Sequence, residues 1–294
     1  MAQARLIKSR IKSATNIAKI TKAMEMVAAS KMRRSQEQAL ASRPYTHKLL
    51  EMLHTIGTNA DSNLHILLQQ GNPTAPELLI LVSTDKGLAG SLNTNLFRAA
   101  TETLATMRSP RVLAIGRRAR EFAIKFGYPL VAEFSGLPDK LTLADILPIS
   151  EIFVKGFLSG EFSSVRSMHM QFVSTLAQSP EVNLLLPIAM NEIEAEGLQP
   201  QPKLPSGEKK EYTFEPSPKD ILDFLLPFYT ENGFFQIMLE AKASEHSARM
   251  VAMKNASDNA KEIVGNLKLE YNKSRQAGIT SELLDITTAA LALK

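Results

Sequence analysis

The sequence predicts an α/β fold in which the N- and C-terminal segments form a long antiparallel two-helix coiled coil, with a central α/β domain inserted between them. Three observations predict it. The first proline is Pro44 and the first glycine is Gly57, so the N-terminal segment has almost no helix breaker. After Pro227 there is no further proline and there are only three glycines. Between the two segments, strand-like apolar runs alternate with amphipathic helices.

The N-terminal segment, residues 1–56, is expected to form one long helix, in which Pro44 introduces a kink or a restart. Fifty helical residues would span roughly 75 Å. The segment is basic, with eleven Lys and Arg against three Glu. Such a charge fits either a solvated helix face or a surface that meets carboxylates or anionic lipid. The expected apolar stripe consists of Ile7, Ile11, Ala14, Ile17, Ile20, Met24 and Val27.

The C-terminal segment, residues 218–294, has apolar and small residues at alternating spacings of three and four, the heptad pattern of a coiled coil. The register breaks over residues 272–280, where side chains are expected to turn away from the seam. The two terminal segments most simply pair with each other. The expected seam is Met250, Met253, Ser257, Ala260, Val264, Leu267 and Tyr271, resuming at Ile279, Leu283, Ile286, Ala290 and Leu293.

The middle of the chain is expected to form a Rossmann-like α/β domain over residues 77–190. A connector at 57–76 precedes it, and a proline-rich return loop at 191–217 follows it. The alternation of strands and helices favours a mainly parallel sheet covered by helices. Strands are expected at 77–85, 111–116, 164–174 and 181–188, and helices at 92–107, 117–127 and 141–160.

The glycine-bearing turn STDKGLAGSLN (83–93) joins an expected strand to an expected helix, a place where phosphates often bind. Neither the P-loop spacing nor the G-x-G-x-x-G pattern is present, so Gly87 and Gly90 are a weak signal. A tight turn is the favoured interpretation, with Asn93 as a candidate helix cap. A ligand at this turn stays open as an alternative.

The composition gives little support to catalysis. The chain has no cysteine, which excludes thiol nucleophiles and thiolate metal sites. It has no tryptophan and few other aromatic residues, which argues against a stacking platform for nucleic acid. The five histidines show no metal-ligand spacing, and no apolar run reaches the roughly 20 residues of a membrane helix. We therefore expect no catalytic residue, no cofactor and no metal.

Several stretches resemble one known family. KITKAMEMVAASKMRRSQ (19–36) and SRPY (42–45) resemble its opening, and STDKGLAGSLNTNLF (83–97) resembles its central turn. YTFEPSP, beginning at residue 212, resembles its return segment, and residues 244–286 resemble its C-terminal signature. That family is the γ subunit of the F-type ATP synthase. The resemblance runs from end to end of the chain and is most specific in the two terminal motifs.

The resemblance implies a non-catalytic rotor shaft. The helices would turn inside a ring of alternating α and β subunits, and the central domain would lie against the ε subunit and the membrane c-ring. Proton flow through the c-ring would turn the shaft and change the conformation of each catalytic site on β. The implied location is peripheral, on the cytoplasmic face of a bacterial inner membrane, with no membrane span and no nucleic acid partner.

The resemblance also implies contact residues. Residues 272–280 correspond to the positions with which the family engages a loop of β, and the return segment corresponds to its contact with the c-ring and ε. The apolar C-terminal tip is expected to act as a non-directional bearing. The expected β-subunit contacts are Met24, Arg275, Gln276 and Thr280, the c-ring and ε contacts are Tyr212, Phe214 and Glu215, and the bearing tip is Leu283, Ile286, Leu291 and Leu293.

Two other classes of function stay open. One is a nucleotide-dependent α/β enzyme built on residues 77–190, with the helices as an oligomerisation arm. The other is a coiled-coil scaffold whose basic arm binds nucleic acid, with an affinity that falls steeply with salt. The cations of residues 5–34 are interleaved with expected core positions, which disfavours the scaffold.

Overall fold

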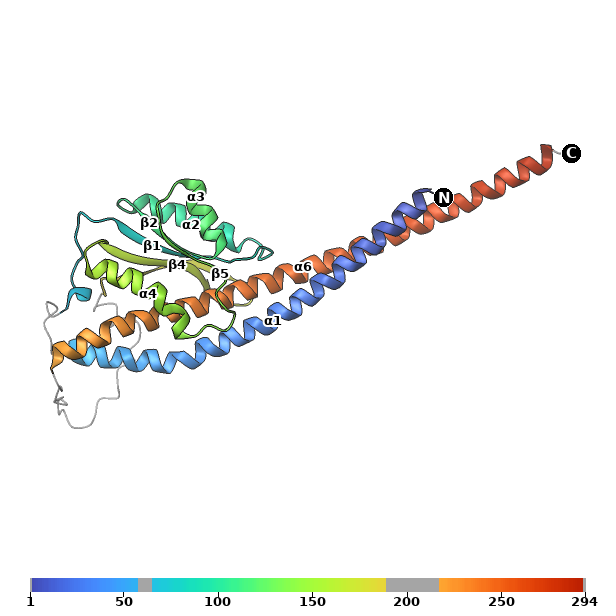
Figure 1. Cartoon of the computed structure of the whole chain (residues 1–294). Helices are drawn as coiled ribbons and strands as arrows, with labels where there is room; N and C mark the ends of the chain where they lie inside the picture. The colour runs from blue at the N-terminus through green and yellow to red at the C-terminus, as the bar shows by residue number, and fades with distance from the viewer. Residues whose placement is uncertain (1, 58–64, 189–216, 293–294) are drawn as a thin grey trace. The chain divides into compact units, whose positions relative to one another are not determined.

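The computed structural model describes residues 2–57, 65–188 and 217–292 (Figure 1). The longest elements are two helices, α1 (Ala2–Gly57) and α6 (Pro218–Ala292), and each continues through its internal proline without a break. The expected restart at the first of these prolines does not occur. Within the described residues, no helix combines the length and the apolar character that crossing a membrane requires.

The chain divides into two compact units, and the division cuts both long helices. The first unit consists of Met1–Ala29 together with Arg249–Lys294, and the second unit is Ser30–Ala248. The middle of the chain thus shares its unit with the end of α1 and the start of α6. The domain boundaries expected from the sequence, at residues 56 and 77, instead lie close to the end of α1 and the start of β1 (Glu77–Val82).

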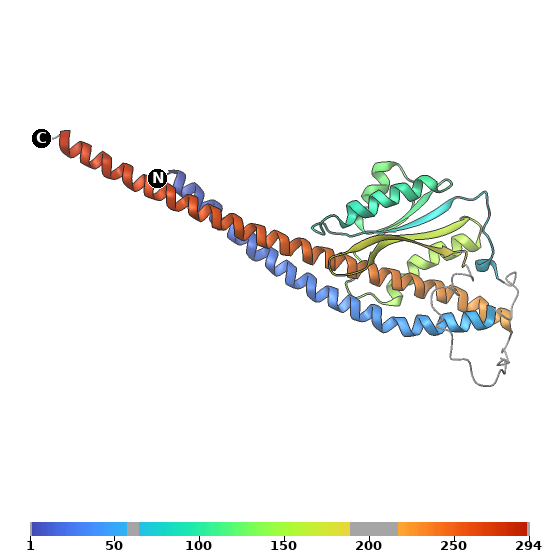
Figure 2. The ribbon, with the colours of Figure 1, turned by 180° about the vertical axis from the view of Figure 1, so that it is seen from behind.

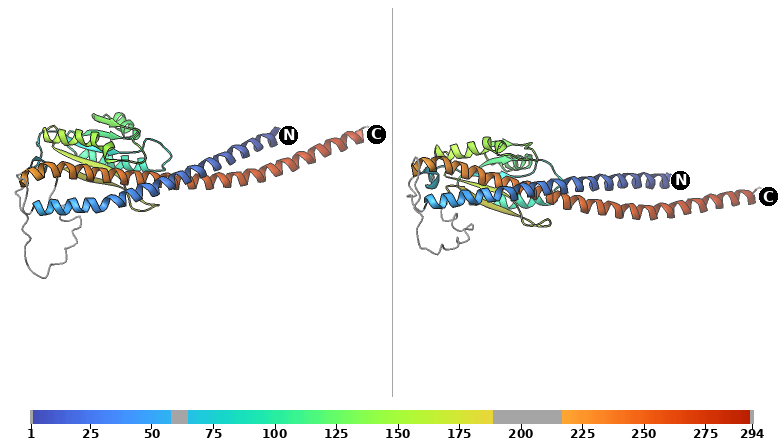
Figure 3. Two further views of the ribbon diagram at one scale, coloured as in Figure 1. Left: turned by 60° about the horizontal axis from the view of Figure 1, so that its bottom comes forward. Right: turned by 90° about the horizontal axis from the view of Figure 1, so that it is seen from below.

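In the first unit, α1 and α6 run antiparallel, side by side (Figures 2 and 3). The Ser257 hydroxyl donates a hydrogen bond to the carbonyl oxygen of Ala18 at 3.3 Å, across the helix pair. The heptad spacing predicted on α6 is confirmed as far as Tyr271. The seam on α6, buried or half-buried, is Met250, Met253, Ser257, Ala260, Val264, Leu267, Tyr271, Ser274 and Gly278. The seam on α1 is Ile7, Ile11, Ala14, Ala18, Thr21, Glu25 and Ala28.

The seam on α1 corrects part of the expected stripe. Ile17, Ile20 and Val27 are exposed by 53%, 60% and 55%, whereas Ala18 and Ala28 are buried. From residue 18 onward, the buried positions of α1 are therefore shifted by one residue from the stripe that the sequence predicted. Small side chains occupy the contact because they let two helix backbones approach more closely than branched side chains do.

The expected register break at residues 272–280 is wrong. Helix α6 is continuous there, and the half-buried Ser274 and Gly278 extend the spacing of three and four. Ile279, where the seam was expected to resume, is 50% exposed. A count of apolar residues could not find a seam made of serine and glycine. Figure 2 shows α6 continuing past the N-terminal end of α1, so Leu283 is exposed.

The second unit contains a five-stranded sheet with the strand order β3-β2-β1-β4-β5. All neighbouring strands pair parallel except β4 and β5, which are antiparallel. The mainly parallel sheet predicted from the alternation of strands and helices is confirmed. The strands are β1 (Glu77–Val82), β2 (Arg111–Ile115), β3 (Leu130–Phe134), β4 (Ser164–Phe172) and β5 (Gln178–Leu186).

Helices cover both faces of this sheet (Figure 1). Leu81 of β1 packs in a cluster with Leu96 of α2, whereas Ile80 points to the opposite face. There, Phe153 of α4 and Phe234 of α6 meet edge to face with ring centroids 5.3 Å apart. Burial on both faces explains the unbroken apolar run of β1. The covering helices are α2 (Leu92–Thr106), α3 (Arg117–Phe126) and α4 (Leu143–Leu158), and a short 3-10 helix, η2 (Ile66–Leu68), precedes β1.

Strand β3 was not expected from the sequence. It lies at the edge of the sheet, is only five residues long and has no fully buried residue. Glu133, its fourth residue, is exposed and pairs with Arg120 at 2.5 Å. A short, half-buried edge strand that includes a charged residue lacks the longer apolar run that marks the other strands.

Candidate functional site

The expected β-subunit contacts on α6 lie on the surface of the first unit. Arg275, Gln276 and Thr280 are all exposed. The Thr280 hydroxyl donates to the carbonyl oxygen of Gln276 at 3.0 Å, a bond within the helix, so its donor is already used. In the part of the chain that the structure describes, no ion pair joins Arg275 to an acid. Its guanidinium thus remains available to an external carboxylate.

Arg275 borders a groove between the start of α1 and α6. The groove has a volume of about 320 Å³, and Arg5, Lys8 and Arg275 contribute three cations to it against the single acid Glu282. Two helices that were far apart in the sequence therefore gather positive charge at one place. This arrangement favours an anionic partner group, because the summed field of clustered cations attracts carboxylates.

A second exposed feature of the first unit is an apolar stripe on α1. Ile17, Ile20, Met24 and Val27 are spaced by three and four residues, so they share one face of the helix. Met24 is half-buried and the other three are exposed. An apolar face at heptad spacing, not used by the pair itself, is typical of a surface that contacts other subunits.

The remaining expected contacts are described only in part. Tyr212, Phe214 and Glu215 lie outside the described residues, as does Leu293. Leu291 belongs to α6, but its side chain lies outside what the structure describes. In the bearing tip, Leu283 and Ile286 are exposed by 58% and 65%.

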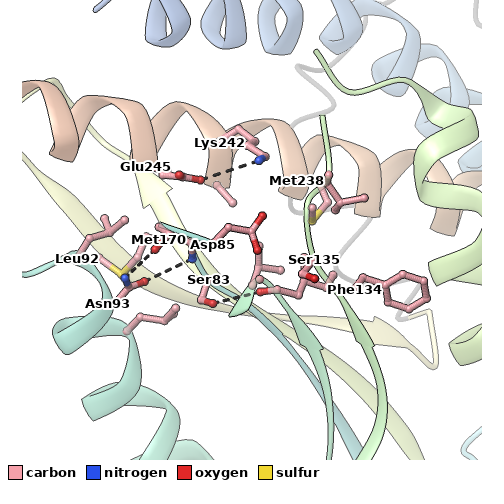
Figure 4. A pocket seen from close by; sticks show the side chains of 17 residues that line it. Ser83, Asp85, Leu92, Asn93, Phe134, Ser135, Met170, Met238, Lys242 and Glu245 are labelled. Atoms are coloured by element: carbon pink, nitrogen blue, oxygen red, sulfur yellow. Dashed lines mark hydrogen bonds and ion pairs between the residues drawn. The ribbon is translucent and has the colours of Figure 1, made fainter. Parts of the chain in front are cut away.

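The central turn is held together by its own polar groups (Figure 4). The carboxylate of Asp85 accepts hydrogen bonds from the backbone N–H groups of Arg117 at 3.1 Å and Gly136 at 2.9 Å. The Ser83 hydroxyl accepts one from the Ala119 N–H at 2.7 Å. Asn93 lies inside α2 and donates to the Thr84 hydroxyl at 2.8 Å, so it braces the turn and does not cap the helix.

The cavity beside this turn is small. It has a volume of about 20 Å³, which is room for a single water molecule and far too little for a nucleotide. Figure 4 shows Lys242 and Glu245 of α6 on its far side, paired at 4.0 Å. Gly116, with φ 87°, closes the next turn, where a Cβ would meet the Ser83 carbonyl oxygen at 2.4 Å. These contacts favour the structural interpretation of the turn over a ligand site.

Two clusters of ionisable side chains in the second unit were missed by sequence reasoning. Asp139 lies between Lys31, whose Nζ is 2.6 Å from Oδ2, and His246, whose Nε2 is 3.7 Å from Oδ1. Burial pushes the pKa of Asp139 up, but the hydrogen bond and charge of Lys31, with the charges of His246 and Lys242, hold that pKa below its ordinary value. The group ties α1, the loop before α4, and α6 together.

The second cluster combines His169 of β4, Glu181 of β5 and Glu240 of α6. The ligand atoms of the three residues lie within 4.8 Å of one another. Sequence spacing could not find this group, because strand pairing and helix packing bring together residues 71 positions apart. The one available signal was a histidine inside an apolar strand.

Comparison with known proteins gives a consistent result over the whole chain. The ATP synthase family model matches residues 3–293. The ATP synthase gamma chain of Herpetosiphon aurantiacus is 43% identical, over 100% of this chain and 99% of the relative. That of Dehalococcoides mccartyi strain CBDB1 is 42% identical, over 100% of both.

Solved structures share the fold. A chain of the Euglena gracilis mitochondrial ATP synthase, in a structure of OSCP, F1 and the c-ring, matches with a TM-score of 0.68 and 16% identity, over 99% of this chain and 95% of that one. A chain of the rotor of the same enzyme matches with a TM-score of 0.65 and 17% identity, over 95% and 99%. The similarity to bacterial gamma chains extends over the full length of the chain, and the two terminal motifs and the paired long helices agree with it. The chain therefore belongs to the γ-subunit family of the F-type ATP synthase.

Proposed function

We propose that this chain is the non-catalytic central shaft of an F-type ATP synthase. It turns inside the ring of α and β subunits and couples proton flow through the c-ring to conformational changes at the catalytic sites of β. The observation that best supports the proposal is the pattern of exposed apolar and basic side chains on the first unit. The surface of this unit carries an exposed apolar stripe on α1, and a cationic groove lies beside Arg275, where α1 begins.

The two surfaces suit different contacts with the ring. The apolar stripe from Ile17 to Val27 offers contact without a fixed direction, which suits a rotating surface. The groove offers charge-assisted hydrogen bonds, which are directional and stronger. Arg275 and Gln276 are the contacts that transmit torque to β in this proposal, and Met24 lies at the edge of the apolar stripe.

The other partners are the ε subunit and the c-ring, which the return segment with Phe214 and Glu215 contacts. The location is peripheral, on the cytoplasmic face of a bacterial inner membrane, a proposal supported by the bacterial relatives. The nucleotide-dependent enzyme is not favoured, because the cavity at the central turn admits about one water molecule.

Rotation itself tests the proposal. The chain has no native cysteine, so a Lys125→Cys variant, on the exposed face of α3, can carry a single fluorescent label. The labelled chain is assembled with the α and β subunits of the same organism, and the ring is fixed to a surface. We expect the label to rotate in one direction when ATP is added and to stay still with ADP. A complex that hydrolyses ATP while the label stays fixed would refute the shaft.

A further inference from the structure

A buried histidine in the second unit lacks hydrogen-bond partners. His169 is 1% exposed, and among the residues that the structure describes, neither its Nδ1 nor its Nε2 has a hydrogen-bond partner. It lies on β4, with its side chain on the sheet face that α6 covers. A buried polar atom without a partner is costly, so such an atom marks a position where a further group belongs.

Two carboxylates face this histidine from different elements. Glu181 lies directly opposite His169 in the antiparallel β4–β5 register, and its Oε2 is 4.0 Å from Nε2. Glu240 of α6 places its Oε2 at 3.8 Å from the same nitrogen. Both separations are too long for a hydrogen bond from an imidazolium N–H, so a simple ion pair does not account for the arrangement.

The other oxygen of each carboxylate is held by a neighbouring amide. The Asn183 Nδ2 donates to Oε1 of Glu181 at 3.1 Å, and the Gln236 Nε2 donates to Oε1 of Glu240 at 3.3 Å. Each amide therefore holds one oxygen, and the other oxygen, Oε2, faces His169. Metal-binding carboxylates and imidazoles typically have such supporting hydrogen bonds.

The space between the three ligand atoms has the size of an ion. Two of the separations are 4.0 and 3.8 Å, and the three atoms lie within 4.8 Å of one another. A point equidistant from all three is therefore about 2.5 Å or less from each, against about 2.0–2.2 Å for zinc bonds to nitrogen and oxygen. Small rotations of the two partly exposed carboxylates close the difference. A neutral imidazole with two carboxylates also carries the charge that a divalent cation balances.

From this geometry we propose that His169, Glu181 and Glu240 bind a divalent transition metal of the zinc type, with water as the remaining ligand. One imidazole nitrogen and two carboxylate oxygens form a ligand set that zinc accepts. Because the ligands come from β4, β5 and α6, the metal links the antiparallel edge of the sheet to the long helix. Its role is a structural clasp within the second unit, independent of any contact with other subunits.

Zinc titration of the full-length chain tests the proposal. A tag-free, metal-free preparation is titrated with zinc chloride in a calorimeter. We expect one zinc per chain with micromolar or tighter affinity. We also expect the melting temperature to rise by about 5 °C at a zinc concentration a hundredfold above Kd. Cobalt in place of zinc should give visible absorption bands from a nitrogen- and oxygen-ligated ion.

Isosteric variants separate metal binding from folding. Glu181→Gln and Glu240→Gln keep the side-chain size and remove one anionic ligand, so each should weaken zinc binding at least about tenfold and abolish the cobalt bands. Glu133→Gln, on the exposed edge strand β3, is the matched control and should bind zinc as tightly as the native chain. No zinc binding by the native chain, or equal binding by all three variants, would overturn the site.

Discussion

Arg275 is an exposed cation beside two others, with no acid paired to it among the described residues. We predict that Arg275→Ala combined with Gln276→Leu slows ATP turnover of the assembled complex about tenfold or more. A charge-assisted hydrogen bond contributes roughly 1.5–3 kcal/mol, enough to shift a conformational equilibrium at a catalytic site by that factor. Steady-state hydrolysis by purified complex is the measurement.

Lys261→Ala provides the control for that double variant. Lys261 is also on α6, its side chain is 61% exposed, and it pairs with Asp258 one turn away. Its removal should leave turnover unchanged, because an exposed pair of this kind contributes little. Native rates of proton-driven synthesis in the double variant, in a complex that is fully assembled, would remove Arg275 from the mechanism.

Asp139 gives the second unit an acid-dependent contribution to stability. Its folded-state pKa lies below its ordinary value of 3.8, so the charged form is stabilised by folding. That contribution is fully present above the unfolded pKa and is lost as pH falls through the lower folded pKa. We predict that Asp139→Asn lowers the free energy of unfolding at neutral pH and that the difference from the native chain shrinks in acid. Urea unfolding across the pH range measures it, and a constant difference would contradict the assignment.

At the scale of the helix pair, neighbouring residues on α1 should respond in opposite ways to a change in size. Ala18→Ile places a branched side chain in the seam and should destabilise the chain by about 1–3 kcal/mol. Ile17→Ala removes an exposed side chain and should change stability by no more than about 0.5 kcal/mol. Chemical denaturation of both variants tests the register. The reverse order of effects would mean that the isoleucine faces α6.

The same pair of residues shows what heptad spacing could and could not establish. The sequence predicted two long helices, their antiparallel pairing and the seam on α6 up to Tyr271. It could not place the seam on α1, because Ile17 and Ala18 both continue a spacing of three and four, and apolar size favours the wrong one. Likewise Ser274 and Gly278 carry no apolar signal, so the spacing of apolar residues predicts a break where the seam in fact continues.

The exposed end of α6 should tolerate shortening. A chain that ends after Thr288 lacks six residues, and we predict that its complex retains ATP turnover with a modest loss of assembly stability. Apolar contact is non-directional, so losing part of it removes affinity without removing a specific joint. Turnover and thermal dissociation of the complex are the measurements. Loss of turnover in a complex that remains assembled would show that the tip transmits torque.

For the molecule as a whole, the return segment should hold the catalytic sector to the membrane. We predict that replacing Phe214 and Glu215 with alanine releases more of the catalytic sector from washed membranes, because an aromatic anchor and a charge are lost together. Retained ATPase activity on the membranes is the measurement. Replacing Glu151 and Lys155, an exposed pair on α4, serves as the control. Unchanged retention in the first variant would exclude the segment from docking.

The order of elements in the whole chain could be predicted, but the contacts between distant elements could not. Strand and helix periodicity predicted four of the five strands and all of α2, α3 and α4. The groups around Asp139 and His169 depend on which strand lies beside which and on which face of α6 meets the sheet. Those relations are set by packing over long sequence separations, and no local spacing encodes them.

The small residues of the α1–α6 seam also set how the first unit deforms. Ala18 and Ser257 meet through a hydrogen bond from side chain to backbone, so the two helix axes lie closer than leucines would allow. The resistance of two joined rods to twisting falls as their separation falls. A pair built this way twists further under a given torque than a pair spaced by leucines. Part of the work done by an applied torque is therefore stored in the pair as elastic strain and released gradually, as in a torsion spring.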